Sequence, residues 1–363
     1  MQTQRSNMKI LVMGGTGAMG SHLVELAKAA AIEVTVTSRT KSGTDGSVQH
    51  IQGNAKDDQF LNSLLSTKWD AIIDFMVYST TQFQQRLPLF LAATRQYFFL
   101  SSARVYADSP TPISEDTPRL LDICQDATFL ATEEYALAKA KQEDLLRDSG
   151  AKNWTIIRPY ITYARERLQL GVLEKEAWLY RALKGRSIVF SRDIIDHMTT
   201  MTSGRDVARG ILSLVGKPTA MAEAFHITSS QPHSWKRVLE IYLQILEIHL
   251  GKTPKVLLVD MDDFLRCHNG KYQVKYDRMF DRSFNTSKFN EHTPINSFTE
   301  CNEGLRSCIT EFLKQPIFKD VNWTLEAEKD RLTGEYTSLK EIPGNRNKLK
   351  YLLLRYLHLN FNI

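Results

Sequence analysis

A tyrosine and a lysine four residues apart are the side chains of this sequence best suited to acid–base chemistry. Tyr135 and Lys139 belong to the stretch Tyr-Ala-Leu-Ala-Lys, and on a helix such a pair projects from one face, about one turn apart. A free phenol titrates at about pH 10, and lowering its pKa to near neutrality requires about 4 kcal/mol, which the ammonium and a bound cationic cofactor could supply together. The same spacing also occurs by chance, as a solvated lysine beside a half-buried tyrosine. Its meaning therefore depends on the elements that position it.

The chain begins with the pattern of a strand, a glycine turn and a helix. Residues 9–13 are a short apolar run, and residues 21–31 are helix-forming with an apolar face. Between them, Gly14 permits a tight turn, Gly17 lets the backbone approach a pyrophosphate, and Gly20 allows close helix packing. The N-terminus of the helix offers unpaired N–H groups to the phosphates. We therefore assign to a dinucleotide site the residues Gly14, Thr16, Gly17, Ala18, Met19 and Gly20.

The end of the second expected strand, residues 33–37, indicates which dinucleotide fits. An NAD site places an acidic residue there to bind the ribose 2′-hydroxyl, whereas this chain has Ser38 and Arg39, followed by a threonine and a lysine. The hydroxyls and cations favour NADP, with NAD as the alternative. A basic solvent-exposed loop is the other interpretation. Asn54, after the next strand, is placed to hydrogen-bond the adenine edge.

Two further strands lead toward the Tyr135 and Lys139 pair. Residues 69–77 are nearly continuous in apolar residues, as burial on both faces of a parallel sheet demands. Tyr78 follows at the carboxyl end, where ligands sit in such sheets, and we expect it to contact substrate. Residues 97–100 form the next strand. The alternation of strands and helices predicts an α/β fold with a Rossmann-type doubly wound parallel sheet.

The order and spacing of these motifs resemble the extended short-chain dehydrogenases/reductases, the NAD(P)-dependent epimerase/dehydratase family. The shared motifs, over roughly residues 8–320, are the glycine triplet, Ser-Ser-x-x-Val-Tyr at 101–106, Tyr135 with Lys139, and Arg158-Pro159. The resemblance implies that Ser102 orients the substrate hydroxyl or carbonyl, that Tyr135 exchanges its proton, and that Lys139 binds the nicotinamide ribose and lowers the tyrosine pKa. Hydride would pass between a substrate carbon and nicotinamide C4. The resemblance also implies a smaller C-terminal substrate-binding lobe.

Departures from the family pattern narrow the chemistry. Sugar 4,6-dehydratases carry Asp-Glu directly after the Ser/Thr, but here Ala103 and Arg104 stand there, so elimination of water is not expected. Arg104 is retained as a candidate substrate contact. Arg165 and Arg167 occupy a stretch where a Gly-Pro is usual, and they either meet a substrate diphosphate or carboxylate or form a solvated charged surface. His197 is a further substrate candidate, although a structural role is the better expectation.

The sequence predicts three regions. Residues 1–160 form the dinucleotide-binding domain, joined by a returning segment near residues 195–228, and residues 161–330 mainly form the substrate-binding lobe. Residues 331–363 lie outside the resemblance and include a basic amphipathic helix candidate at 346–358. This tail could dock on its own core, contact another subunit or attach to a membrane surface, with core docking favoured.

Composition excludes several classes of protein. Of 363 residues, 42% are hydrophobic and 24% charged, which is ordinary for a soluble globular chain. The net charge of +5 is modest, so we expect no nucleic-acid partner. No run is long enough for a membrane span or a signal sequence, and a cytoplasmic location is expected. The four scattered cysteines indicate neither a metal site nor a disulfide framework.

The leading hypothesis is an NADP-dependent oxidoreductase or epimerase acting on a hydroxyl or keto carbon of a sugar, with a nucleotide sugar as the expected substrate. Reduction and epimerisation share the same hydride step, so these residues do not separate them. The alternative is a non-catalytic dinucleotide-sensing or RNA-binding protein, because relatives of this fold include redox-sensing regulators and RNA-binding proteins of plastids, and fold alone does not give function. The sequence leaves a homodimer open.

Overall fold

The computed structural model describes residues 8–357 and divides the chain into two compact units. Unit 1 contains the residues up to Ala164 together with Thr200–Pro232 and Arg282–Cys301. Unit 2 contains Arg165–Thr199, His233–Asp281 and the residues from Asn302 onward. This division differs from the expected one in two respects. Residues 282–301 also return to unit 1, and the residues after 331 belong to unit 2. The end of the expected tail, residues 358–363, lies outside the described residues.

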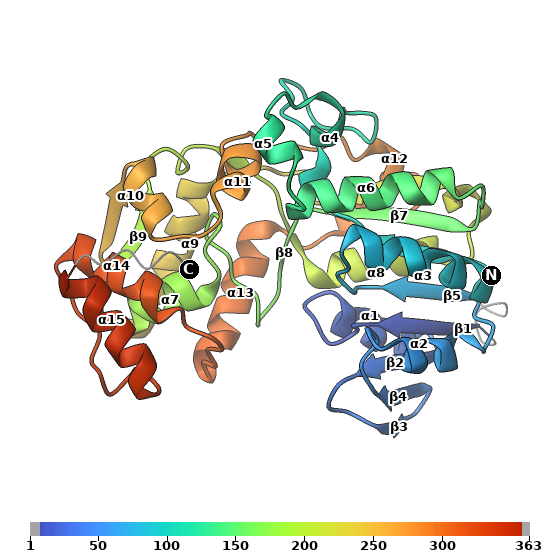
Figure 1. The fold of residues 1–363 in the computed structure, drawn as a ribbon, viewed down its shortest axis with the longest axis horizontal. Coiled ribbons are helices and arrows are strands. Elements are labelled where there is room, and N and C mark those ends of the chain that lie inside the picture. The colour runs from blue at the N-terminus through green and yellow to red at the C-terminus, as the bar shows by residue number, and fades with distance from the viewer. Residues whose placement is uncertain (1–7, 358–363) are drawn as a thin grey trace. The chain divides into compact units, whose positions relative to one another are not determined.

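Unit 1 is built on an eight-stranded sheet with the order β12-β7-β6-β5-β1-β2-β4-β3, most of which can be followed in Figure 1. The strands are β1 Lys9–Met13, β2 Glu33–Ser38, β3 Gly43–Asp45, β4 Val48–Gln52, β5 Ala71–Asp74, β6 Tyr97–Leu100, β7 Trp154–Pro159 and β12 Glu223–Ile227. Neighbours pair in parallel, except that β3 is antiparallel to β4. The chain moves outward from β1 to β4 and then crosses back to β5, so the order reverses at β1. This confirms the predicted Rossmann-type doubly wound sheet.

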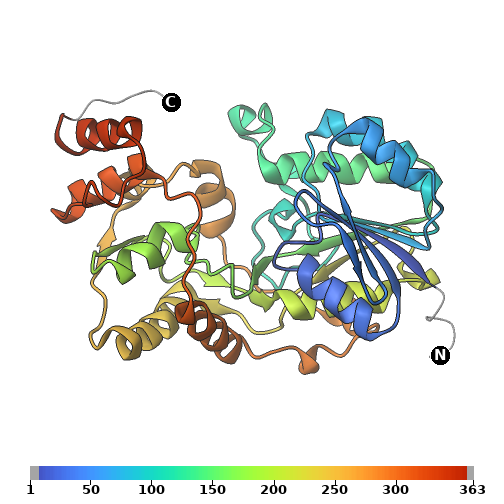
Figure 2. The same cartoon turned by 90° about the horizontal axis from the view of Figure 1, so that it is seen from below.

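Helices cover both faces of this sheet, as Figure 2 shows. The helices of unit 1 are α1 Gly20–Ala29, α2 Asp58–Leu65, α3 Thr80–Ala93, α4 Leu120–Ile123, α5 Ala127–Leu130, α6 Tyr135–Asp148, α8 Gly204–Leu214 and α12 Ser287–Asn290. One core cluster joins α1, α8 and α12 to alternate sheet residues such as Ile10 and Val12. A second joins α2, α3 and α6 to the intervening residues, such as Leu11 and Met13. Because side chains alternate along a strand, a central strand such as β1 contributes to both cores.

Strand β5 ends earlier than the apolar pattern predicted. Its last residue is Asp74, whereas the sequence favoured a strand over residues 69–77, and Val77 is 52% exposed. The side chain of Asp74 accepts the backbone N–H of Met76 at 2.9 Å, which turns the chain out of the ladder. Asp74, the second of two acids in this stretch, was the signal for this boundary.

Unit 2 is smaller and mainly helical. Its elements are α7 Lys175–Leu183, β9 Ile188–Ser191, β10 Met198–Thr199, β13 His233–Ser234, α9 Trp235–Leu250, β14 Val256–Val259, α10 Met261–Arg266, α11 Lys271–Gln273, most of α13 Cys301–Lys314, α14 Trp323–Thr333 and α15 Asn345–Leu357. Strand β9 pairs in parallel with β14, and β10 pairs antiparallel with β13. Within residues 8–357, no helix is both long and apolar enough to cross a membrane.

Helix α15, the basic helix expected in the tail, docks on its own unit. Tyr351 and Leu354 are buried with Ala327 of α14 in a small apolar cluster. The Tyr351 hydroxyl donates to Asp330 Oδ2 at 2.7 Å, and Asp330 also receives the fully buried Arg181 guanidinium at 2.8 Å. These contacts support core docking, the interpretation that the sequence favoured. The last residue of the expected helix, His358, lies outside the described part of the chain.

Candidate active site

The glycine turn between β1 and α1 has the geometry that a dinucleotide pyrophosphate requires. Gly14 has a φ of +72°, a conformation that side chains rarely adopt. A Cβ on Gly17 would meet nothing within 4 Å, so backbone is open to a ligand there. A Cβ on Gly20 would lie 2.6 Å from the Cα of Gly15, so this glycine lets the helix begin against the turn. The turn therefore fits the predicted cofactor, and Thr16, Ala18 and Met19 lie within it.

One residue of this region escaped the sequence analysis. Gly204 begins α8, and a Cβ there would overlap the carbonyl oxygen of Ala18. The close approach presses the N-terminus of a second helix against the glycine turn. A lone glycine after Ser203, at the start of a helical pattern, was the available signal.

Ser38 is the last residue of β2, and Arg39 follows it. This is the position predicted for residues that discriminate between NADP and NAD. The Ser38 hydroxyl is buried and accepts the backbone N–H groups of Thr40 and Lys41 at 3.2 and 3.1 Å, which shapes the loop. The side chain of Arg39 is exposed. Asn54 is also exposed, and its side chain accepts the Lys56 N–H at 3.1 Å. Arg39 is thus available to a 2′-phosphate, whereas Ser38 mainly holds the turn.

Ser102 lies just after β6, and Tyr135 and Lys139 belong to α6, all in unit 1. Ser102 follows β6 and is buried, and its Oγ accepts the Arg104 N–H at 3.2 Å. Tyr135 is the first residue of α6 and is 37% exposed, whereas Lys139, one turn later, is 2% exposed. The Lys139 Nζ lies 5.9 Å from the centre of the Tyr135 ring. The pair thus shares one helix face, with the phenol toward solvent and the ammonium in the interior.

Arg104 and Glu134 hold the N-terminus of α6 around Tyr135. The Glu134 side chain caps the helix by accepting the Ala136 N–H at 2.7 Å, and it also pairs with the Arg104 guanidinium. That guanidinium lies 5.4 Å from the centre of the Tyr135 ring, and the Lys139 ammonium lies 5.9 Å from it, so two cationic side chains lie near the phenol. Arg104 therefore faces the predicted acid–base residue.

A buried ionic network ties α6 to the sheet. Glu143 accepts two hydrogen bonds from Arg158 of β7, at 2.8 and 2.6 Å, and one from the Ser101 hydroxyl at 2.6 Å. Burial raises the pKa of Glu143, but the charge and hydrogen bonds of Arg158 outweigh it and hold the pKa below its usual value. Arg158 also donates to the Tyr106 hydroxyl at 2.9 Å. Residues of the Ser-Ser-x-x-Val-Tyr and Arg-Pro motifs thus meet beneath α6.

Asp74 is a buried carboxyl on the side of the sheet that α6 covers. The sequence analysis did not identify it as a candidate. Asp74, at the end of β5, is 1% exposed, and burial raises its pKa from 3.8 to about 6. Burial also lowers the pKa of Lys139 from 10.5 to about 8, against the opposing effect of the Asp74 and Glu143 charges. This part of unit 1 therefore contains a buried carboxyl whose pKa is raised and a buried amine whose pKa is lowered.

Three other predicted substrate contacts have partners within the protein. Tyr78 is 4% exposed and packs in the core cluster with residues of α3, with its hydroxyl 3.5 Å from Asp74, which supports a core role, and its contact with substrate stays a prediction. Arg165 and His197 belong to unit 2. Arg165 pairs with Glu166, and His197 Nδ1 lies 3.1 Å from Asp281, which is consistent with a structural histidine. Substrate contact by these two residues stays a prediction.

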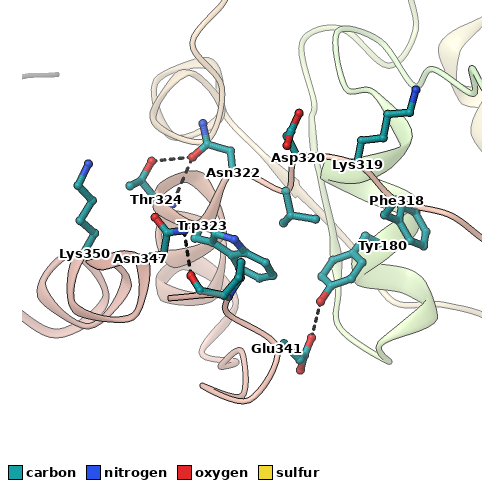
Figure 3. Close-up of a pocket in the computed structure, with 12 residues that line it drawn as sticks. Tyr180, Phe318, Lys319, Asp320, Asn322, Trp323, Thr324, Glu341, Asn347 and Lys350 are labelled. Carbon is teal, nitrogen blue, oxygen red and sulfur yellow. Dashed lines mark hydrogen bonds between the residues drawn. The ribbon is translucent and has the colours of Figure 1, made fainter. Parts of the chain in front are cut away.

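Unit 2 contains a separate cavity of about 630 Å³ (Figure 3). Its aromatic walls are Tyr180, Phe318 and Trp323, and the Tyr180 hydroxyl donates to Glu341 at 2.7 Å. Lys319 and Lys350 line it together with Asp320 and Glu341, so the lining favours neither an anion nor a cation. The residues predicted for the active site are absent from its walls.

A family model for the NAD dependent epimerase/dehydratase family matches residues 10–227 of this chain. The chain belongs to this family. The match includes the glycine turn, Ser102, Tyr135, Lys139 and Arg158. The membership confirms the resemblance that the motifs indicated.

Solved structures show the same fold. An epimerase from Methanothermobacter thermautotrophicus has a TM-score of 0.67 and 16% identity, over 86% of this chain and 95% of that one. WbmH from Bordetella bronchiseptica, solved with NAD+, has a TM-score of 0.65 and 15% identity, over 85% of this chain and 100% of its own. UDP-glucuronic acid 4-epimerase from Bacillus cereus, solved with UDP-glucuronic acid and NAD, has a TM-score of 0.63 and 17% identity, with the same coverage.

A curated relative is the chloroplast stem-loop binding protein of 41 kDa b from Arabidopsis thaliana. It is 27% identical over 243 residues, which are 62% of this chain and 60% of the relative. The chain thus matches about 60% of the length of this relative. The name of this relative describes a protein that binds stem-loops.

Proposed function

We propose that this chain is a nicotinamide-dinucleotide-dependent enzyme that transfers hydride at a hydroxyl or keto carbon of a sugar. The observation that carries the proposal is the placement of Tyr135 and Lys139 on one face of α6, with the phenol exposed and the ammonium buried. A protein that only bound a dinucleotide would not need this arrangement. The open backbone at Gly17 and membership of the family support the same conclusion.

Each side chain has a distinct role in the proposed reaction. The Ser102 Oγ accepts a backbone N–H, so its O–H is free to donate to the substrate oxygen. Tyr135 takes the proton from a substrate hydroxyl on oxidation and returns it on reduction. Lys139 stabilises the phenolate and binds the ribose of the cofactor. The bound nicotinamide supplies the hydride chemistry at its C4 carbon.

The cofactor is proposed to be NADP, with NAD as the alternative. Arg39 is exposed at the carboxyl end of β2, where an acidic residue would select NAD. The solved structures of WbmH and of the Bacillus cereus epimerase contain NAD, which favours the alternative. A tightly retained NAD would indicate an epimerase that recycles its hydride, and exchangeable NADPH would indicate a reductase.

A nucleotide sugar is the proposed substrate, because the Bacillus cereus epimerase was solved with UDP-glucuronic acid and MoeE5 with UDP-glucose. Purified protein should be incubated with a panel of UDP-sugars and each dinucleotide, and the products followed by proton NMR. We expect a new epimer or a reduced or oxidised sugar, and Tyr135→Phe should slow its formation by about 10²-fold or more. Equal turnover by wild type and Tyr135→Phe would disprove the acid–base role.

RNA binding is the second candidate, and the similarity to the stem-loop binding protein favours it. Contacts to phosphates make affinity fall steeply with salt. A labelled RNA stem-loop should therefore be titrated with the protein between low and physiological salt. Submicromolar binding with a steep salt slope, together with no turnover on the sugar panel, would favour this function over the enzyme.

A further inference from the structure

Asp74 faces the helix that carries the acid–base pair. Ile72 belongs to the core cluster shared with α2, α3 and α6, and Asp74, two residues along β5, points to the same side. Its Oδ2 accepts the Tyr97 hydroxyl at 2.8 Å, and its Oδ1 accepts the Met76 N–H at 2.9 Å. The Tyr78 hydroxyl is a third, longer donor to Oδ1 at 3.5 Å. The hydrogen bonds described for this carboxyl thus come from uncharged donors.

Lys139 reaches the same place from α6. Its Nζ lies 4.6 Å from the centre of the Phe99 ring. Phe99 of β6 is the direct ladder partner of Asp74 in β5. Neighbouring strands lie about 5 Å apart, and the side chains of ladder partners point to the same face of the sheet. The Asp74 carboxyl and the Lys139 ammonium therefore lie in the same part of this core, and their charges interact.

The titratable and charged groups around Lys139 come from several elements. Asp74 belongs to β5, Tyr97 to β6, and Tyr135 and Glu143 to α6. Tyr78 follows β5, and the Arg86 guanidinium of α3 lies 5.3 Å from the centre of the Tyr78 ring. Arg86 is itself paired with Asp58 at 2.7 Å. Two of these groups are carboxyls, Asp74 and Glu143.

The two carboxyls differ in how much of their charge is already matched. Glu143 is paired through both oxygens with the Arg158 guanidinium. The described hydrogen bonds of Asp74 come from neutral groups, so the negative charge of Asp74 is available to balance the positive charge of Lys139. An ammonium buried to this extent without an opposite charge would lose its proton.

We propose that Asp74 is a positioning residue that keeps Lys139 in its ammonium form beside Tyr135. Asp74 thereby sets the upper pH limit at which the tyrosine–lysine pair can work. The coupling between the two groups stands on the geometry of unit 1 alone. Its consequence for catalysis rests on the proposed function.

The test measures the charge of Lys139 directly. Protein labelled with ¹³C at lysine Cε is titrated by NMR, and the Lys139 signal is identified by its loss in Lys139→Met. We expect a midpoint near pH 8 in the wild type, and a midpoint lower by about one pH unit or more in Asp74→Asn, which is isosteric. An unchanged midpoint in Asp74→Asn would overturn the proposal.

Two controls address repacking. Tyr97→Phe removes a donor from Asp74 but leaves the carboxylate, so the Lys139 midpoint should stay close to that of the wild type. The reciprocal measurement follows Asp74 through its carboxyl carbon, and in Lys139→Met its midpoint should rise from about 6, because the coupling acts equally on both groups. This arm does not need Asp74→Asn to fold, and an unchanged Asp74 midpoint would equally overturn the proposal.

Dinucleotide binding separates this inference from the proposed function. Wild type and Lys139→Met are titrated with NADPH and NADH across the same pH range. In one outcome, the Lys139 midpoint shifts in Asp74→Asn, but the dinucleotide affinity changes neither with pH nor in Lys139→Met. This result would support the coupling between Asp74 and Lys139 and refute the role of Lys139 in binding the cofactor. In another outcome, the Lys139 midpoint is unchanged in Asp74→Asn, but Lys139→Met weakens dinucleotide binding. This result would refute the coupling and leave the proposed role of Lys139 at the cofactor standing.

Discussion

Lys139 has to remain charged in an environment that disfavours charge. Its side chain is 2% exposed, and burial lowers its pKa to about 8. Tyr135, its partner in the predicted acid–base pair, is 37% exposed at the N-terminus of α6, and the Arg104 guanidinium lies 5.4 Å from the centre of its ring. The sequence located Tyr135 and Lys139 through their spacing, because helical periodicity fixes which side chains share a face. The sequence could not identify Asp74 as a neighbour of this pair, because that requires knowing which helix packs against the strand that carries Asp74.

Arg39 provides a test of cofactor choice at a single side chain. Arg39→Ala should weaken NADPH binding by about tenfold or more while changing NADH binding little, because only NADPH offers a 2′-phosphate to a guanidinium. Binding is measured by titration of dinucleotide-free protein. Arg95→Ala is the matched control, since Arg95 is an exposed arginine of the same unit, paired with Asp70 at 3.1 Å. Equal losses for both dinucleotides in Arg39→Ala would contradict NADP selection.

Strands and helices were predictable where a local rule fixes them. The β1 strand, the glycine turn and α1 follow from glycine spacing and apolar periodicity, and β6 from a four-residue apolar run. Strand β3 was missed because its residues, Gly43–Asp45, are exposed and lack alternation. The segment between Pro118 and Tyr135, left undefined by the sequence, contains the short helices α4 and α5. Short elements of this kind depend on tertiary contacts that no local pattern encodes.

The docking of α15 on α14 can be tested with two tyrosines of one helix. The Tyr351 hydroxyl donates to Asp330 and accepts the Thr337 N–H, both at 2.7 Å. Tyr351→Phe leaves that buried N–H without its acceptor and should cost about 1–3 kcal/mol of unfolding free energy. Tyr356 is 59% exposed, so Tyr356→Phe should have little effect. Urea denaturation compares the variants, and equal stability of both would contradict the described docking.

At the scale of the whole chain, the fold is shared with proteins of known structure, and a shared fold does not give the substrate. The order of strands and the family were predictable, since several motifs occur in one order along the chain. The boundaries of unit 2 were less so, because its segments are interleaved with those of unit 1. Solved relatives at 15–17% identity establish the fold and leave the substrate open. The proposed nucleotide-sugar substrate and the cytoplasmic location remain predictions.

The dinucleotide that the purified protein carries or accepts tests the central claim most directly. The protein is denatured and any released dinucleotide identified, and emptied protein is then titrated with NADPH and NADH. The proposed function predicts that at least one is retained or binds, and that Lys139→Met weakens the binding. Failure of wild-type protein to bind either dinucleotide, while it still binds an RNA stem-loop with steep salt dependence, would contradict it.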